Sequence, residues 1–438
     1  MTKDITQEDL ARYEKDLAEF PGAEPLARAV QSSGVLAASK NHAAKQHLDR
    51  VFSVDLKTGK VANQKQSGRC WLFATLNTLR HKVAEKINVK DFEFSQNYNS
   101  FYDRLEKANA FLEKMIELAD KPLDDRNVQW FLRWGDDDGG QWANAVALIE
   151  KYGLVPKSVM DETYTSNKTD DLNATLNRRL KMDALTLRKM VADGASDEDI
   201  QAKKEEFMSE VYRMLVFAFG KPVEKFDFEY RDDKKKYHID RDLTPQEFFK
   251  KYVDINFDDY VCLTDAPDHE MGKLYSMPSQ DFIPGGREIR FAIVDTDAIN
   301  KAAAAQLKDG ESVWFGCDVL EDMDRKQGIL DPDYFKQDEL FGLDLNFSKK
   351  DRLASGEGEC SHAMTFTGVD LVDGKPTKWK VENSWGEKNG EKGYFIMTSK
   401  WFDDYTYEVI VNKKYLTDDQ KAILKQDPTP VKPWDSLR

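Results

Sequence analysis

The sequence has no long hydrophobic run and no excess of basic charge. None of its apolar stretches approaches the roughly 18–20 residues that span a bilayer, and the N-terminus, MTKDITQEDL, has neither the basic start nor the apolar stretch of a secretory signal. Lys and Arg number 64 against 79 Asp and Glu, which gives a net charge of −15. Because nucleic-acid surfaces need clustered Lys and Arg, we expect neither a membrane nor a nucleic-acid partner.

Cysteine is also scarce. The four cysteines, Cys70, Cys262, Cys317 and Cys360, lie far apart in the sequence and form no CxxC pair. In a long chain without a secretory signal, this usage indicates free thiols in a reducing compartment. We therefore expect a cytoplasmic protein, with neither a metal nor a cofactor.

The first half of the chain has the apolar spacing of helices. With 438 residues, 40% of them hydrophobic, the chain can bury a large core, and its length suggests two to three domains of about 150 residues. A Thr6 cap opens one predicted helix, and others begin near Cys70, Gln96 and Gln141. Residues 50–61, RVFSVDLKTGKV, predict a hairpin or an extended segment instead.

The second half changes character. Residues 169–219 are highly charged with helical spacing, and residues 225–240 alternate as a long hairpin would. Thr244 and Pro245 indicate a cap and a first-turn proline. From about residue 287 strand patterns dominate, so we expect an α+β protein whose helices precede an antiparallel sheet or barrel.

A candidate nucleophile stands in NQKQSGRCWLFATLN (63–77). Cys70 follows Ser67-Gly68-Arg69 and falls in the first turn of the predicted helix. A helix N-terminus stabilises a thiolate through its free N–H groups and dipole. By its position alone, however, such a cysteine is more often a small buried hydrophobe.

Two further residues make the chemical interpretation stronger. His362 opens the apolar strand of SHAMTFTGVD, and Asn383 follows it by 21 residues in ENSWG. Each has a plain structural alternative, since a histidine at a strand start is often satisfied structure and Asn-Ser-Trp-Gly is often a turn. The other histidines lie in polar or charged surroundings: His42, His47, His81, His238 and His269.

The order Gln, Cys-Trp, His, Asn-Ser-Trp-Gly resembles the papain superfamily. The resemblance implies a papain-like two-lobed core of α+β class, with a helical lobe and an antiparallel, barrel-like lobe. It implies that Cys70 is the nucleophile, His362 the general acid and base, and Asn383 the residue that orients His362. Gln64 and the Cys70 backbone N–H would bind the oxyanion, and Trp385 would cover the His–Asn bond.

Two departures indicate one branch of that superfamily. The helix begins with SGRCW, not CGSCW, and Cys70 and His362 are 292 positions apart, against roughly 130–150 in papain-like chains. Both features resemble the bleomycin hydrolase / aminopeptidase C family, as do the blocks DRLEKANAFLEK and VENSWGEKNGEKGYFIMTSKWFDDY. That family implies a cysteine aminopeptidase that removes N-terminal residues from oligopeptides through a thioester, in a homohexamer whose active sites face an inner cavity.

The resemblance also suggests a division of the chain. We expect an N-terminal segment packing on the core at residues 1–60, followed by a helical catalytic lobe at 61–164. An inserted helical and hook-hairpin region at 165–285 comes next. A β-rich catalytic lobe at 286–417 and a C-terminal arm toward the active-site cleft at 418–438 complete the chain. The hairpin 225–240 is a candidate for contact between subunits, or else a solvated surface hairpin.

Substrate binding is predicted at two places. Gly139 and Gly140 resemble the strip that holds the substrate main chain in this superfamily, although a helix-capping loop is an equal alternative. The sequence ends KQDPTPVKPWDSLR, and in the family the C-terminal arm lies in the cleft and its free carboxylate binds the substrate's α-amino group. Only three residues follow the Pro-Trp-Asp element, and the Arg438 side chain would offset the pull on an ammonium group. A shorter arm would favour oligo-endopeptidase cleavage.

Two other function classes stay open. An acyltransferase with a Cys-His-Asp triad shares the order of nucleophile and histidine, but an Asn follows His362 here. A non-enzymatic binding protein would need no set of four catalytic residue types.

Overall fold

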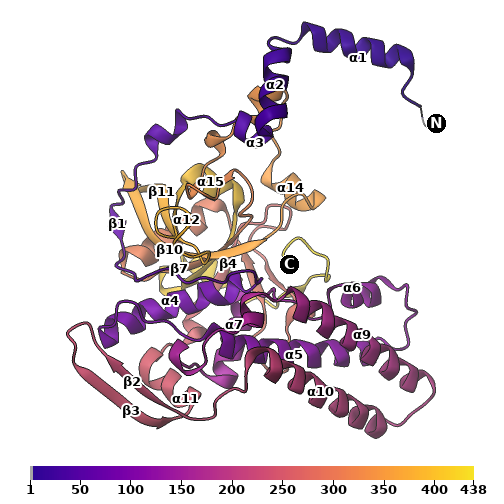
Figure 1. Ribbon diagram of the computed structural model, residues 1–438, viewed down its shortest axis with the longest axis vertical. Coiled ribbons are helices and arrows are strands. Elements are labelled where there is room, and N and C mark those ends of the chain that lie inside the picture. The colour runs from indigo at the N-terminus through magenta and orange to yellow at the C-terminus, as the bar shows by residue number, and fades with distance from the viewer. Residues whose placement is uncertain (1–2) are drawn as a thin grey trace.

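The computed structural model describes residues 3–438, in which a layer of helices packs against a large mixed sheet (Figure 1). Met1 and Thr2, which belong to the predicted segment 1–60, lie outside the described residues. One hydrophobic core lies within the helical layer and reaches the sheet, and a second lies between the sheet and the helices on its other side. In the part of the chain described, no helix is long and apolar enough to cross a membrane.

The helical layer comes mainly from the first half of the chain. Ser95 caps α5 by accepting a hydrogen bond from the Tyr98 N–H, and Ser196 caps α10 in the same way. Gly153 ends α7 at φ +78°, where a Cβ would lie 2.4 Å from the Pro245 carbonyl carbon. The helices of this layer are α4 (Cys70–Ile87), α5 (Gln96–Glu117), α6 (Arg126–Trp134), α7 (Trp142–Tyr152), α8 (Tyr164–Asn167), α9 (Asp170–Ala192), α10 (Asp197–Phe219) and α11 (Pro245–Phe248).

The sheet is mixed, which corrects the expectation of an antiparallel one. The strands β4 and β6, β5 and β14, and β9 and β12 pair in parallel, because these partners are joined by long connections and not by hairpins. The path runs β14-β5-β6-β4-β13-β7-β10-β11-β12-β9-β8, and β1 pairs with β10. Its strands are β1 (Val54–Asp55), β4 (Tyr260–Thr264), β5 (Leu274–Ser276), β6 (Arg290–Ile293), β7 (Val313–Cys317), β8 (Met323–Asp324), β9 (Ile329–Leu330), β10 (His362–Val372), β11 (Lys375–Glu382), β12 (Tyr394–Thr398), β13 (Thr406–Asn412) and β14 (Thr429–Pro430).

Most of the predicted elements are confirmed. The helices beginning near Cys70, Gln96 and Gln141 are α4, α5 and α7, and the predicted hairpin is β2 (Phe226–Arg231) with β3 (Tyr237–Leu243). The hairpin alternative for residues 50–61 is wrong, because this segment stays extended and only β1 forms, on the edge of β10. Helices not predicted on the sheet side are α12 (Thr296–Lys308), α13 (Gln337–Phe341), α14 (Lys349–Ser355), α15 (Ser399–Tyr405) and α16 (Asp418–Ile423).

The N-terminal helices project away from the rest of the chain (Figure 1). Thr6 forms the predicted cap of α1 (Gln7–Glu19), in a capping box with Asp9. Every α1 residue except the half-buried Asp9 is exposed, so the expected packing on the core does not hold for α1. The helices that follow it are α2 (Ala23–Ser33) and α3 (Val35–Ala38).

Helix α4 joins the two layers. The Trp314 indole of β7 donates to the Trp71 carbonyl at 3.1 Å, and the Thr365 hydroxyl of β10 donates to the Ala74 carbonyl at 3.3 Å. These bonds connect the first turns of α4 to the sheet. They bring the N-terminus of α4 close to the N-terminal end of β10, where the predicted site residues lie.

A buried ionic group fixes the same contact further along the helix. The carboxylate of Glu382 on β11 pairs with Arg80 and lies 3.0 Å from the His81 Nε2 atom. Burial opposes its charge, but Arg80 and His81 together lower the pKa of Glu382 to about 2. The group therefore stays ionised and holds α4 against the sheet at neutral pH.

Candidate active site

Cys70 occupies the first position of α4, as predicted. The loop before it is fixed because the Asp138 carboxylate accepts a hydrogen bond from the Gly68 N–H at 2.8 Å. Burial raises the pKa of the Cys70 thiol, while the N–H groups of Ala363, Trp71 and Cys70 itself act to lower it. The sulfur therefore lies beside the backbone of Ala363, the residue after His362.

His362 and Asn383 form the predicted pair. The His362 Nε2 atom lies 3.0 Å from the Asn383 Oδ1 atom, and both residues are buried. The Trp385 ring lies 4.8 Å from the imidazole, centroid to centroid. Because Asn383 engages Nε2, the other ring nitrogen, Nδ1, is the one left for Cys70.

The surroundings of His362 disfavour a lone positive charge. Burial lowers the pKa of His362 to about 4, although the Asn383 bond acts in the opposite direction. Arg325 adds to the lowering, and its guanidinium lies 4.3 Å from the centre of the Trp385 ring. Since burial opposes an isolated charge on Cys70 and on His362 alike, thiolate and imidazolium are favoured only as a pair. Arg325 was not predicted, because it is distant in sequence from every motif.

Gln64 is fixed by two residues of the predicted motifs. Its Nε2 donates to the Ser67 carbonyl at 2.6 Å, and its Oε1 accepts from the Ser384 hydroxyl. Its backbone N–H also donates to the Ser384 carbonyl, at 2.8 Å. An amide nitrogen carries two hydrogens, so Ser67 uses one and the other is available to a ligand. Ser384 is therefore a positioning residue that the Asn-Ser-Trp-Gly motif already contained.

The strip with Gly139 and Gly140 lies directly on the Trp71 ring. A Cβ at Gly140 would come within 2.7 Å of that ring, so the close approach requires glycine. The Trp71 indole donates to the Asp138 carbonyl at 2.6 Å. The buried Lys107 ammonium donates to the carbonyls of Asp137, at 2.9 Å, and Gly139. These contacts fix the strip against Trp71 of α4 and Lys107 of α5.

The charged residues of α5 hold this strip from below. Arg104 pairs with Asp138 and, at 2.6 Å, with Asp136, and all three are buried. Burial opposes the charge of Asp138, but Arg104 lowers its pKa below the ordinary value. Arg104 and Lys107 both belong to DRLEKANAFLEK, yet no spacing rule assigns them a role, because their partners are about 30 residues away on a loop.

A cleft of about 490 Å³ runs along this strip. Gly139 and Gly140 form part of its wall, together with Cys360 and Ser361, the residues that precede His362. Arg438 lines the same cleft, so the structure brings the predicted substrate-binding residues together. Within residues 3–438, no group of three or more His, Cys, Asp or Glu could hold a metal ion.

The Arg438 side chain is held by aromatic rings of α6. Its guanidinium carbon lies 5.0 Å from the centre of the Trp130 ring and 4.5 Å from that of Trp134. The guanidinium also forms an ion pair with the Glu359 carboxylate at 3.7 Å. Cation–π contacts of this kind occupy the guanidinium.

The segment before Arg438 is anchored by His269, which sequence reasoning placed in an ordinary charged loop. Its Nδ1 lies 3.1 Å from Asp268 Oδ1, and its Nε2 lies 3.0 Å from Asp435 Oδ1. The Ser436 hydroxyl donates to Asp268 at 2.6 Å, and the Leu437 side chain is buried. This cluster, His269 with Asp268 and Asp435, is called the arm anchor below.

The comparisons with known proteins agree over the whole length. The model of the peptidase C1-like family matches residues 4–438. Aminopeptidase G of Lactobacillus delbrueckii subsp. lactis is 51% identical, with all of both chains covered. Aminopeptidase C of Lactobacillus helveticus is 45% identical, covering 100% of this chain and 98% of the relative. A crystal structure described as pepw from Lactobacillus rhamnosis superposes with a TM-score of 0.98 at 51% identity, over 100% of this chain and 99% of that one. The chain belongs to the peptidase C1-like family.

Proposed function

We propose that the chain is a cysteine aminopeptidase that hydrolyses oligopeptides, with Cys70 as the nucleophile. The observation that carries this is the helix-start cysteine beside a buried His362–Asn383 pair, joined at 3.0 Å beneath Trp385. The family and the aminopeptidase names of its relatives support it. The same likeness supports a papain-like two-lobed fold, with the chain divided at residues 61, 165, 286 and 418.

The geometry supports a two-step mechanism. The Cys70 proton passes to Nδ1 of His362, and the thiolate attacks the scissile carbonyl carbon. The oxyanion accepts hydrogen bonds from the Cys70 backbone N–H and the Gln64 amide. His362 then protonates the departing amine as the C–N bond breaks, leaving a thioester. Water attacks the thioester, gives a proton to His362, and the acid leaves as the thiol is restored.

The C-terminal segment bears on where the enzyme cuts. Arg438 and Gly139 both line the cleft, and the arm anchor fixes the residues before Arg438. We infer that this segment limits how much peptide can lie before the scissile bond. A second candidate is an oligo-endopeptidase, which the open volume of about 490 Å³ favours, since the cleft stays spacious with Arg438 in it.

One experiment tests the activity and separates the two candidates. A fluorogenic or unlabelled oligopeptide is offered with a free and with an acetylated N-terminus, and the products are identified by mass spectrometry. An aminopeptidase loses all cleavage on acetylation, whereas an endopeptidase makes internal cuts in both peptides. Cys70→Ala should retain the melting temperature within about 2 °C and lose all cleavage, and full activity in that variant would overturn the proposal.

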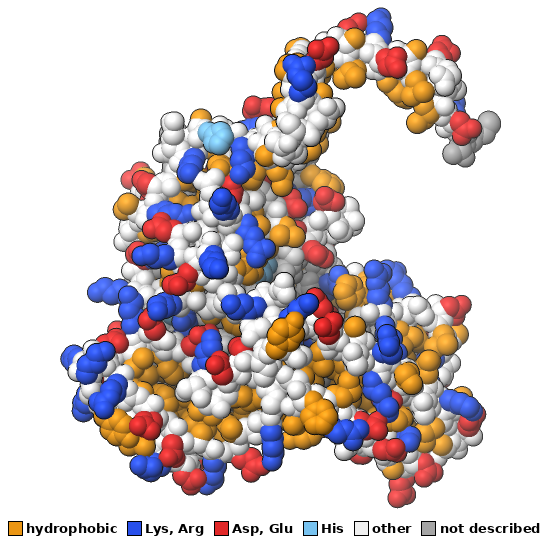
Figure 2. All heavy atoms as spheres, in the orientation of Figure 1, with side chains coloured by type: hydrophobic (Ala, Val, Ile, Leu, Met, Phe, Trp, Pro, Cys, Tyr) orange, Lys and Arg blue, Asp and Glu red, His pale blue; other side chains and the backbone are white. Residues whose placement is uncertain are grey.

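We further propose a cytoplasmic homo-oligomer, which the family resemblance predicts to be a hexamer. The exposed apolar side chains along the projecting N-terminal arm support association (Figure 2). They include Leu10, 43% exposed, and Leu17, 62% exposed, and such stripes mark interaction sites. The β2–β3 hairpin stays a candidate for a subunit contact. Light scattering of the full chain and of a Leu10→Glu/Leu17→Glu variant tests this, since the variant should dissociate.

A further inference from the structure

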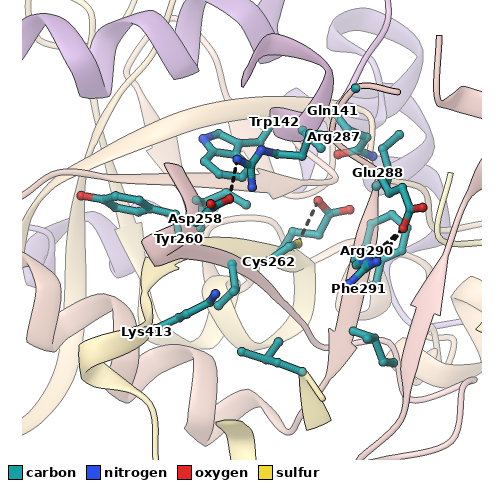
Figure 3. A pocket seen from close by; sticks show the side chains of 18 of the residues that line it. Gln141, Trp142, Asp258, Tyr260, Cys262, Arg287, Glu288, Arg290, Phe291 and Lys413 are labelled. Carbon is teal, nitrogen blue, oxygen red and sulfur yellow. Dashed lines mark hydrogen bonds and ion pairs between the residues drawn. The ribbon is translucent and has the colours of Figure 1, made fainter. Parts of the chain in front are cut away.

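A second cavity, called here the side cavity, shares the lining residue Gln141 with the substrate cleft, and Figure 3 shows it from close by. Its volume is about 700 Å³, and it lies between the start of α7 and strands β4, β6 and β13. Gln141, which directly follows the glycine strip, lines both the cleft and the side cavity. The segment 278–291, which leads into β6, also borders both, the cleft with its first residues and the side cavity with its last.

Glu408 is a buried carboxylic acid on the wall of the side cavity. It lies on β13 and is 2% exposed. The Cys262 thiol is 3.7 Å from its Oε2 atom, and the Gln141 amide also interacts with it. Across the strand pair, a Cβ added at Gly316 would lie 3.5 Å from the Glu408 Cβ and 2.7 Å from the Cys360 sulfur, which lines the cleft. Glu408 therefore stands between the two cavities.

Except for the exposed Lys413, the other charged residues of the side cavity form ion pairs. Arg287 pairs with Glu150 at 2.8 Å and with Asp258 at 2.9 Å. Arg290 pairs with Glu288 at 2.7 Å, and Lys413 is exposed at the rim. Figure 3 marks the Arg287–Asp258 and Arg290–Glu288 pairs with dashed lines.

Glu408 differs because, within residues 3–438, no Lys, Arg or His side chain forms an ion pair with it. Its polar neighbours are a thiol and an amide, while the thiols of Cys262 and Cys360 are themselves kept neutral by burial, which raises their pKa values. Burial likewise raises the pKa of Glu408 to about 8. A carboxyl buried without a cation is costly, and a cationic ligand would pair with it while its proton is released to solvent.

We propose that the side cavity binds a cationic group of the peptide substrate, and that Glu408 is the residue that selects it. The ligand is an ammonium or guanidinium, supplied either by a Lys or Arg side chain or by the peptide's α-amino group. Gln141 places the cavity beside the glycine strip, so the group belongs to a peptide lying in the cleft. This inference rests on the proposed peptidase function and specifies its substrate class.

The first test measures charge preference. The value of kcat/KM is compared for oligopeptides that carry arginine or its neutral isostere citrulline at each position before the cleaved bond. In the unaltered enzyme we expect arginine to be preferred at least about 10-fold at one position, because removing one partner of a buried charge pair is costly. Glu408→Gln should abolish that preference and retain cleavage of the citrulline peptide within about 3-fold. Glu288→Gln is the matched control, because Glu288 already pairs with Arg290, and this variant should retain the preference for arginine over citrulline.

Two arms identify the source of the cation. If the preference for arginine persists in N-acetylated peptides, the cation bound in the side cavity is a side chain of the substrate. A preference for free over acetylated N-termini that disappears in Glu408→Gln assigns it to the α-amino group. Equal discrimination in the unaltered enzyme and Glu408→Gln, or an equal loss in Glu288→Gln, overturns the inference.

The second test needs no catalysis. Binding of the arginine and citrulline peptides to Cys70→Ala is followed by calorimetry at pH 7 in buffers of different ionisation enthalpy. The arginine peptide should bind at least about 10-fold more tightly and release up to about one proton, as Glu408 ionises. The ratio of the two affinities should rise between pH 6.5 and 9. A pH-independent ratio with no proton release overturns the inference even if Glu408→Gln does not fold. If the unaltered protein binds these peptides but does not cleave them, the proposed peptidase function is wrong, and the inference about cation binding is not.

Discussion

His362 and His269 are both largely buried, yet their surroundings move their pKa values in opposite directions. Burial lowers the pKa of His362 to about 4, and its partner is the neutral amide of Asn383. Burial would also lower the pKa of His269, but hydrogen bonds to Asp268 and Asp435 raise it to about 9. The charge of the partner therefore decides whether a buried histidine is a base or a fixed cation at neutral pH.

The largest expected effect on catalysis comes from removing the imidazole ring of His362, and removal of the His269 ring is the comparison. His362→Ala should lower kcat/KM by about 10³-fold or more, because no group remains to take the Cys70 proton. His269→Ala should change the rate at which an iodoacetamide-type probe alkylates the Cys70 thiol by no more than about 3-fold. Rates of Cys70 alkylation and peptide cleavage, measured on the same preparations, check both. A His362→Ala enzyme with a tenth of the original activity contradicts the assigned roles.

The difference between the two histidines also marks what the sequence could predict. Gln64, Cys70, His362 and Asn383 are recognisable because each stands in a local motif, and the structure brings them together as those motifs imply. His269 is not recognisable, because its partner Asp435 comes from the far end of the chain and no local pattern connects the two.

The same distinction holds for the fold. Helices α4 and α5 follow from their apolar spacing, and β2–β3 from alternation, since these are local properties. The parallel pairs of the sheet depend on which distant strands meet, so the antiparallel expectation was wrong there. Glu408 could not be predicted from the sequence for the same reason. Its polar neighbours, Cys262 and Gln141, are distant in sequence, and only the fold brings them to the buried carboxyl group.

Replacing the amide partner of His362 by a carboxylate should make the pKa of His362 resemble that of His269. Asn383→Asp places a carboxylate at Nε2 of His362, so the pKa of His362 should rise as it does for His269. The ring would then hold its proton at neutral pH, and kcat/KM at pH 7 should fall about 10- to 100-fold. The acidic limb of the pH–rate profile should move to higher pH, and NMR titration of the ring measures the pKa directly. An unchanged acidic limb would falsify the comparison.

The reverse exchange should loosen the arm anchor. Asp435→Asn removes one of the two carboxylates that hold His269, so the C-terminal segment should be released from the cleft more often. We expect the ratio of internal to N-terminal cuts to rise about 3- to 10-fold, as measured by mass spectrometry on a long peptide. Asp427→Asn, at an exposed position of the same segment, is the matched control. Equal product patterns in the two variants would show that the anchor does not govern access.

The smallest expected effect is on the stability of the fold, and its pH dependence reports on both histidines. The pKa of His269 is raised from an unfolded value of about 6.5, so its contribution is complete below pH 6.5 and is lost as the pH rises toward 9. The pKa of His362 is lowered, so its neutral ring costs stability as the pH falls from about 6.5 toward 4. His269→Gln should therefore lower the melting temperature by about 1–3 °C at pH 6 and progressively less toward pH 9. His362→Gln should raise it relative to the unaltered chain at pH 4.5 and not at pH 7.5. Scanning calorimetry of both variants across pH 4.5–9 measures the two windows, and parallel curves for the two substitutions would mean that their partners do not set the two charges.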